Sequence, residues 1–85
     1  MCKVTVLGAG HWGLALADVL ANNNCIVKVW ARRQEVVDSI NLNNESSYFK
    51  DIKLNKNIVA TNDLSEAFEY SDFIVISLPI VVIYD

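Results

Sequence analysis

Three glycines carry the clearest chemical signal in this 85-residue sequence, and the chain contains no others. Gly8, Gly10 and Gly13 form a G-x-G-x-x-G pattern between a β-branched run at residues 3–7 and a segment with helical periodicity. In that context Gly8 permits a tight turn, Gly10 lets the backbone approach a pyrophosphate, and Gly13 lets the helix pack against the strand. The pattern predicts a site for a dinucleotide phosphate at a helix N-terminus. The alternative is a strand-to-helix turn that holds no ligand.

Two larger side chains occupy the variable positions of this glycine loop. The backbone N–H of His11 can contact phosphate at the helix start, whereas we expect its side chain to be exposed rather than to act as an acid or base. For Trp12 the sequence leaves two interpretations open, core packing and contact with the cofactor. Packing is considered because Trp12 begins an apolar stripe at helical spacing. The predicted stripe comprises Trp12, Ala15, Leu16, Val19 and Leu20.

Two arginines follow the second predicted strand. An NAD-binding fold usually places an acidic residue there to bind the ribose 2′-hydroxyl, but this chain has Arg32 and Arg33. A guanidinium group suits a 2′-phosphate because of its fixed charge and planar set of donors. The sequence therefore predicts NADP as the cofactor, with NADPH preferred and NAD as the other candidate. The alternative is a solvated pair that opens a helix.

Alternating strands and helices are predicted to position these residues. The strands are expected at residues 3–7, 25–30, 58–61 and 73–78, and the helices at residues 11–23, 34–42 and 63–70. Strict alternation predicts an α/β fold, a Rossmann-like parallel sheet with helices on both faces. Because a complete dinucleotide fold has a second half, we interpret residues 1–85 as the N-terminal portion only of an NAD(P)-binding Rossmann domain, with the C-terminal substrate domain absent.

Three segments carry further expectations. Residues 73–78 are apolar throughout, so we expect a strand that is buried on both faces. Residues 63–66 resemble a capping box in which Asp63, in place of Ser or Thr, is the N-cap of the helix. Residues 43–57 are polar and predict a long loop.

The composition excludes several classes of function. A net charge of −3 gives no general attraction to nucleic acid. The apolar stretch at residues 73–84 is 12 residues long, which is too short to span a membrane, since a span needs about 20. Without a recognisable secretory signal, we expect a cytoplasmic protein in which Cys2 and Cys25 are reduced thiols. We assign no metal ligand and no catalytic residue to this sequence.

Five segments in register resemble the bacterial NAD(P)-dependent glycerol-3-phosphate dehydrogenases, and together they cover nearly the whole chain. In that family a Trp-Gly pair follows the second glycine, as Trp12-Gly13 does here, and this pair and the loop with Tyr48 favour the family over related dehydrogenases. The five segments are residues 8–17, residues 29–33, residues 44–58 with Tyr48-Phe49, residues 60–64 and residues 77–79.

This resemblance implies a cytosolic oxidoreductase that reduces dihydroxyacetone phosphate to sn-glycerol 3-phosphate, the precursor of glycerophospholipids. It implies a homodimer when the protein is full length. It also implies that catalytic lysines and substrate-binding residues lie beyond this chain, because Lys50, Lys53 and Lys56 do not match them. We therefore expect the 85 residues alone to be inactive. The resemblance places the cofactor on His11, Trp12, Arg32, Arg33 and Tyr48, beside Gly8, Gly10 and Gly13.

Three other interpretations remain open at this point. The chain could be a non-catalytic module that senses NADP(H), or the front end of a related hydroxyacid or sugar-acid dehydrogenase. It could also be a degraded fragment, whose fourth strand would then present an apolar, unpaired edge that favours self-association.

Overall fold

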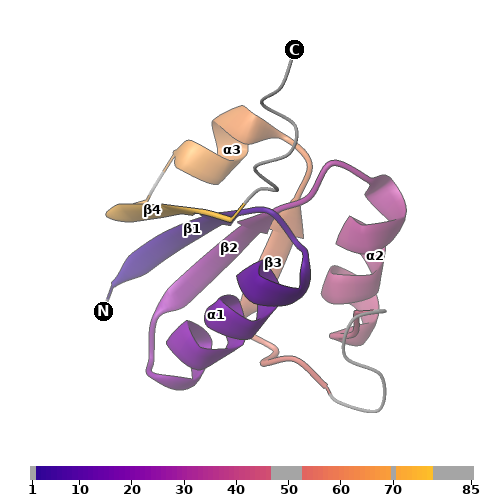
Figure 1. The fold of residues 1–85 in the computed structure, drawn as a ribbon, viewed down its shortest axis with the longest axis horizontal. Coiled ribbons are helices and arrows are strands. Elements are labelled where there is room, and N and C mark those ends of the chain that lie inside the picture. Colours follow the sequence, from indigo (N-terminus) through magenta and orange to yellow (C-terminus); the bar gives the residue numbers. More distant parts are fainter. Residues whose placement is uncertain (1, 47–52, 70, 78–85) are drawn as a thin grey trace.

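The computed structural model describes residues 2–46, 53–69 and 71–77, which form one parallel sheet with helices on both faces (Figure 1). The strand order is β3-β2-β1-β4, so the predicted Rossmann-like α/β fold is confirmed. In chain order the elements are β1 (Lys3–Leu7), α1 (His11–Asn22), β2 (Ile26–Trp30), α2 (Gln34–Asn43), β3 (Ile58–Thr61), α3 (Leu64–Phe68) and β4 (Phe73–Ile76).

The predicted elements differ from the observed ones mainly at their ends. β2 begins at Ile26 instead of residue 25, and α2 continues to Asn43. The predicted ends of α3 at Tyr70 and of β4 at Leu78 lie outside the described residues. All three strand pairs are parallel and in uninterrupted register. Between β1 and β2, the register runs from Lys3 opposite Ile26 to Leu7 opposite Trp30. The carboxyl ends of all four strands therefore lie at one edge of the sheet.

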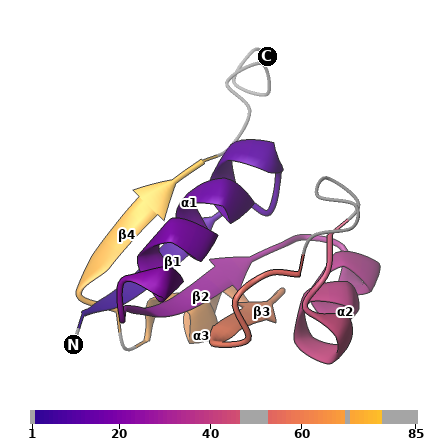
Figure 2. The same ribbon diagram turned by 90° about the horizontal axis from the view of Figure 1, so that it is seen from below.

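The core lies between the sheet and the helix layer formed by α1 and α2, while α3 lies on the opposite face (Figure 2). On the α3 face, the buried Thr5 hydroxyl donates to the carbonyl of Ala67 and contacts the Ser71 hydroxyl, so it ties the end of α3 to β1. The core residues on the other face are Val4, Val6, Leu14, Ala17, Ala21, Val27, Val29, Val37, Ile40, Ile58 and Ala60.

The face that α1 turns toward the sheet differs from the predicted stripe. Trp12, Leu16 and Val19 are exposed, whereas the helix is buried at Gly13, Leu14, Ala17 and Ala21. The prediction was wrong because α1 is apolar around most of its circumference, and the sheet accepts the side with small residues. Small side chains let the helix axis approach the strands, and Leu14 then fills the remaining space.

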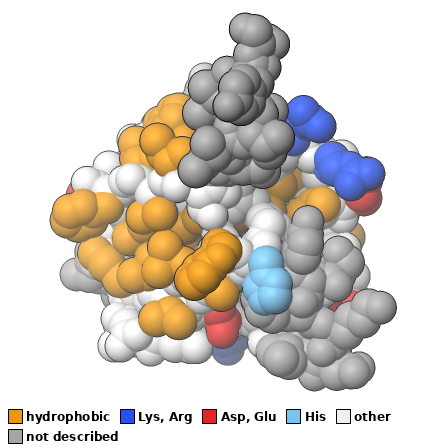
Figure 3. All heavy atoms as spheres, in the orientation of Figure 1, with side chains coloured by type: hydrophobic (Ala, Val, Ile, Leu, Met, Phe, Trp, Pro, Cys, Tyr) orange, Lys and Arg blue, Asp and Glu red, His pale blue; other side chains and the backbone are white. Residues whose placement is uncertain are grey.

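β4 is an edge strand in the described structure, and the prediction that it is buried on both faces was wrong. Phe73 is 63% exposed and Ile76 71% exposed. β4 pairs with β1, and within residues 2–46, 53–69 and 71–77 no other strand pairs with it. Exposed apolar side chains gather on the side of the molecule where α1 and β4 lie (Figure 3). Among the described residues, this edge of the sheet is therefore both apolar and unpaired.

At the opposite edge of the sheet, a side chain covers backbone groups of β3. The amide of Asn41, from α2, donates to the Ala60 carbonyl at 2.9 Å and accepts from the Ala60 N–H at 2.7 Å. One side chain therefore satisfies both outward-facing backbone groups of a residue in the middle of β3.

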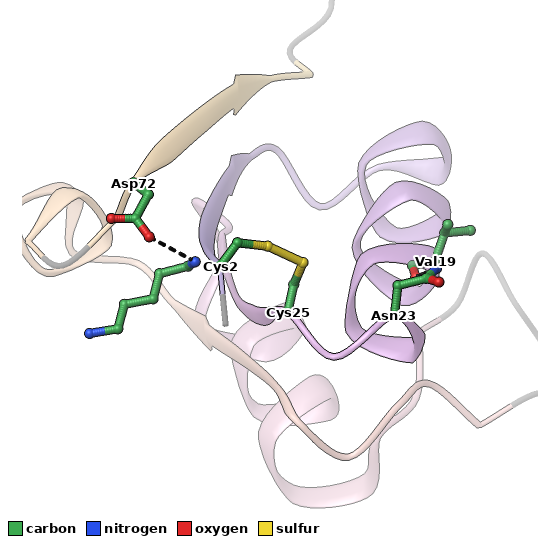
Figure 4. The surroundings of a disulfide bond; sticks show 6 residues. Cys2, Val19, Asn23, Cys25 and Asp72 are labelled. Carbon is green, nitrogen blue, oxygen red and sulfur yellow. Dashed lines mark hydrogen bonds between the residues drawn. A yellow bond between two sulfur atoms is a disulfide. The ribbon is translucent and has the colours of Figure 1, made fainter.

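Cys2 and Cys25 form a disulfide, which corrects the expectation of two reduced thiols. The bond joins the residues that precede β1 and β2, at the amino ends of these strands (Figure 4). The expectation rested on the compartment and on the absence of a secretory signal. The expectation failed because the parallel register of β1 and β2 places the two cysteine side chains next to each other.

Candidate functional site

The glycine loop begins with a turn that only glycine adopts readily. Gly8 has φ 118°, a conformation that is strained for residues with a side chain. Its N–H donates to the Trp30 carbonyl at 2.9 Å, so the turn leaves β1 while it is still bonded to the end of β2. The predicted task of Gly8, a tight turn after the strand, is confirmed.

Gly13 allows the closest contact between α1 and this turn. A Cβ atom on Gly13 would lie 2.1 Å from the Gly8 carbonyl oxygen and 3.1 Å from its carbon. The helix could not keep this position with any larger residue, so the predicted packing task of Gly13 is confirmed.

Ser77 is a neighbour of the loop that the sequence alone did not identify. Its Oγ would lie 3.4 Å from a Cβ on Gly13, and its N–H donates to the Leu7 carbonyl at 2.8 Å. No local sequence pattern predicts that Ser77 lies beside the glycine loop, because its position depends on the pairing of β4 with β1.

Gly10 differs from the other two glycines, because no contact among the described residues requires it to lack a side chain. It is the N-cap of α1 with φ −80° and ψ −169°, and a Cβ atom there would meet nothing within 4 Å. Within the described residues this N-terminus has no side-chain cap hydrogen bond, and its first turn contains no acidic residue. The open space therefore faces backbone donors and the positive end of the helix dipole, which suits an anion.

His11 and Trp12 lie beside that space at the start of α1. Trp12 is 83% exposed, so of its two interpretations core packing is wrong for the described structure. His11 is exposed as well, as expected. Both remain predicted cofactor contacts, and both are reachable from solvent.

Arg32 and Arg33 lie at the same edge of the sheet as the glycine loop. The backbone leaves β2 through Ala31, whose N–H donates to the Thr61 carbonyl at 2.9 Å, and both arginines are exposed just beyond it. Arg33 is the N-cap of α2, makes no side-chain cap bond, and pairs with Glu35 at 3.1 Å. The pair is 71% exposed on both sides, so solvent screens it and the guanidinium group stays available to a ligand.

At the start of α3, the free backbone N–H groups are bound by the side chain of the N-cap residue. The Asp63 carboxylate accepts hydrogen bonds from the N–H groups of Ser65 at 2.9 Å and Glu66 at 3.3 Å. The predicted role of Asp63 as the helix cap is confirmed.

Four further observations limit the site. Tyr48, the remaining predicted cofactor contact, lies outside the described residues. In the described ranges, no group of three or more His, Cys, Asp or Glu residues could hold a metal ion. Likewise, none of the helices described is both long and apolar enough to cross a bilayer. A shallow hollow of about 260 Å³ lies near the amino ends of β1 and β2, bordered by Lys3, Ile26 and Lys28, and the glycine loop does not line it.

Comparisons with known proteins agree with this geometry. The family described as NAD-dependent glycerol-3-phosphate dehydrogenase N-terminus matches residues 3–85. Proteins named glycerol-3-phosphate dehydrogenase [NAD(P)+] are similar to the chain: the one from Bacillus velezensis is 45% identical over 80 residues, and the one from Staphylococcus aureus is 41% identical. Each alignment covers 93% of this chain but 23% and 24% of the relative, so the chain spans about a quarter of their length.

Solved structures with the same fold carry the same enzyme name. Glycerol-3-phosphate dehydrogenase from Saccharomyces cerevisiae superposes with a TM-score of 0.84 at 32% identity, covering 94% of this chain and 27% of the yeast chain. The enzyme from Coxiella burnetii superposes with a TM-score of 0.80 at 30% identity, covering 88% of this chain and 23% of that chain.

Proposed function

This chain belongs to the NAD-dependent glycerol-3-phosphate dehydrogenase N-terminal family, and we propose that it is the part of such an enzyme that binds the pyrophosphate and adenosine of NAD(P)H. The single observation that carries the proposal is the space at Gly10, which the described residues leave open in front of an α1 N-terminus without a side-chain cap bond. Glycine at this position has no packing reason within the described residues. It has a reason if a phosphate group comes close to the backbone there.

The described residues fit this cofactor. The N–H groups at the start of α1 would hold the pyrophosphate, and Arg32 and Arg33 would contact the adenosine end, beyond the adjacent strand. When bound, the nicotinamide ring supplies the hydride. The contribution of this chain is to bind and orient the cofactor at the carboxyl edge of the sheet.

The reaction that we propose for the whole protein is the reduction of dihydroxyacetone phosphate to sn-glycerol 3-phosphate, as a step toward glycerophospholipids. Polarising the ketone oxygen needs a charged group, and the family resemblance places the lysines for this task outside these 85 residues. We expect the 85 residues to bind NADPH without oxidising it when dihydroxyacetone phosphate is added. NADPH oxidation by this chain alone, followed by the loss of absorbance of the reduced cofactor, would contradict this assignment.

A longer protein that carries this chain provides the complementary measurement. It should oxidise NADPH when dihydroxyacetone phosphate is present and not when the phosphate-free ketone replaces it. Binding of NADPH without turnover of any ketone phosphate would favour a sensor module instead.

We propose a preference for NADPH over NADH, based on the two exposed arginines where an acidic residue would select NADH. The test is the affinity of both nucleotides for the wild type and for the Arg32→Ala, Arg33→Ala double variant. Charge-assisted hydrogen bonds to a 2′-phosphate should make the double variant bind NADPH about 10-fold to 100-fold more weakly and leave NADH nearly unchanged.

The matched control for this experiment is the Lys53→Ala, Lys56→Ala double variant. It removes the same number of positive charges from exposed positions away from the glycine loop. A similar loss of NADPH affinity in this control would assign the effect to net charge. Equal affinities of the wild type for NADPH and NADH would refute the preference.

We also propose that the whole protein is a cytoplasmic homodimer, on the strength of the family resemblance. Light scattering on the full-length protein should give twice the mass of one chain, and a monomer would contradict this. Cell fractionation tests the compartment, and recovery with the membrane or secreted fraction would overturn it.

A further inference from the structure

Cys2 and Cys25 form the one bonded cysteine pair of the chain, and the proposed function does not use them. Both residues are half-buried against the core, so a small reagent can reach them. Their Cα atoms are 4.9 Å apart, within the usual range for disulfides. The spacing comes from the sheet itself, because Lys3 lies opposite Ile26 and the Ile26 N–H donates to the Cys2 carbonyl at 2.8 Å.

We propose that this pair is a reversible redox modification site whose co-substrate is a low-molecular-weight disulfide. One cysteine thiolate attacks the disulfide of the co-substrate, forms a mixed disulfide and releases one thiol. The second cysteine thiolate then attacks the protein sulfur of that mixed disulfide and releases the second thiol. The protein loses two electrons and two protons, and the co-substrate is reduced to two thiols.

The register of β1 and β2 favours the second step. The same strand pairing that places Cys2 beside Cys25 persists when the bond is open, because it depends on backbone hydrogen bonds and on the buried Val4, Val6, Val27 and Val29. The resolving thiol is therefore held close to the mixed disulfide, and the intramolecular bond forms faster than a bond between two chains.

The disulfide closes a covalent loop that includes the glycine loop. The two cysteines are separated by 23 positions, and the segment between them contains β1, the glycine loop and α1. The turn back from α1 is short: Asn24 has φ 69° and the Cys25 N–H donates to the Leu20 carbonyl at 3.1 Å. Oxidation therefore ties the whole proposed pyrophosphate-binding unit to the start of β2.

The position of the bond separates stability from ligand access. It lies at the amino ends of the strands, whereas the glycine loop lies at their carboxyl ends. Restricting the unfolded chain should stabilise the oxidised protein without changing the shape of the loop. The prediction for cofactor affinity rests on the proposed function, whereas the predictions for bond formation and melting do not.

The first experiment follows the bond chemically. The full chain is equilibrated in mixtures of reduced and oxidised glutathione, its free thiols are alkylated, and it is analysed by mass spectrometry after digestion. We expect a cross-link between the peptides of Cys2 and Cys25 in the oxidising mixtures and two alkylated cysteines in the reducing ones. Two alkylated cysteines in every mixture, a stable glutathione adduct, or a bond between two chains would overturn the proposal.

The second experiment measures the consequence for stability. The oxidised full chain should melt at least about 10 °C above the chain reduced with dithiothreitol. Cys2→Ser and Cys25→Ser single variants, and the double variant, should show no dependence on dithiothreitol. If these variants fail to fold, the two states of the wild type still give the comparison, and equal melting temperatures would refute the stabilising role.

NADPH affinity is measured in both redox states as the third readout. We expect values within about twofold of each other, because the bond is remote from the loop. A much weaker affinity in one state would contradict the separation of the two ends. Absence of NADPH binding in both states would count against the proposed function and would leave the cross-linking and melting results intact.

Discussion

The N-termini of α1 and α3 lie at the same edge of the sheet and are completed in opposite ways. At α3, the Asp63 carboxylate accepts from two backbone N–H groups of the first turn. At α1 the equivalent position is Gly10, where the part of the chain that the structure describes supplies no side-chain cap bond and leaves the adjacent space open. α2 is intermediate, since its N-cap Arg33 also makes no cap bond and brings a positive charge instead. A helix whose donors are satisfied internally serves the fold, whereas a helix whose donors face open space can serve a ligand.

The largest expected effect comes from giving α1 the cap that α3 has. Gly10→Asp should fold, because the backbone there is extended and a Cβ meets none of the described residues within 4 Å. As a cap it should also stabilise the chain by a few tenths of a kcal/mol, roughly the difference between aspartate and glycine at this position. Its negative charge should weaken NADPH binding by at least about 100-fold, since like charges in contact cost several kcal/mol. Fluorescence titration measures the affinity.

Gly10→Ser is the control for this prediction, because it caps the helix without a charge. It should lose less affinity than the aspartate variant and gain similar stability. Wild-type affinity in the Gly10→Asp variant would mean that no phosphate group approaches Gly10, and the contrast between α1 and α3 would lose its functional meaning.

The next effect concerns how α1 is seated. Gly13→Ala places a Cβ atom 2.1 Å from the Gly8 carbonyl oxygen, a backbone atom that cannot rotate away. We expect a loss of about 1–3 kcal/mol in the free energy of unfolding, measured by urea denaturation, together with weaker NADPH binding. Gly10→Ala is the matched control, and its stability should stay within about 0.5 kcal/mol of the wild type. Equal stabilities of the two alanine variants would show that the helix shifts without strain.

The smallest effect concerns the helix that is already closed. Asp63→Ala removes both cap bonds of α3 and should lower the free energy of unfolding by about 1 kcal/mol. NADPH affinity should remain within about twofold of the wild type, because the start of α3 is not part of the proposed site. Asp63→Asn should retain most of the stability, since its amide oxygen can accept the same bonds. A large loss of NADPH affinity in Asp63→Ala would place α3 in the cofactor site.

The features that the sequence predicted well are those that neighbouring residues decide. The turn at Gly8, the contact at Gly13 and the cap at Asp63 each depend on a few consecutive positions, and alternation of short strands and helices is enough to predict a parallel sheet. The cofactor roles of Gly8, Gly10, His11, Trp12, Gly13, Arg32, Arg33 and Tyr48 remain predictions that binding experiments must test.

The features that the sequence missed depend on contacts between distant residues. Hydrophobicity favoured the side of α1 with Leu16 and Val19, but close approach to the sheet selected the side with Ala17 and Ala21. The bond between Cys2 and Cys25 follows from the register of two strands, which no local pattern contains. The exposure of β4 depends on its place in the strand order.

Asn41 has a consequence for how this sheet can grow. Its amide occupies the outer side of Ala60 as the backbone of another strand would, so an incoming strand would first have to displace two hydrogen bonds. At the opposite edge, no side chain among the described residues covers the outer backbone groups of β4 in this way. The two edges of the sheet therefore differ: a further strand can pair with β4, whereas a strand that pairs with β3 must first break the hydrogen bonds between Asn41 and Ala60.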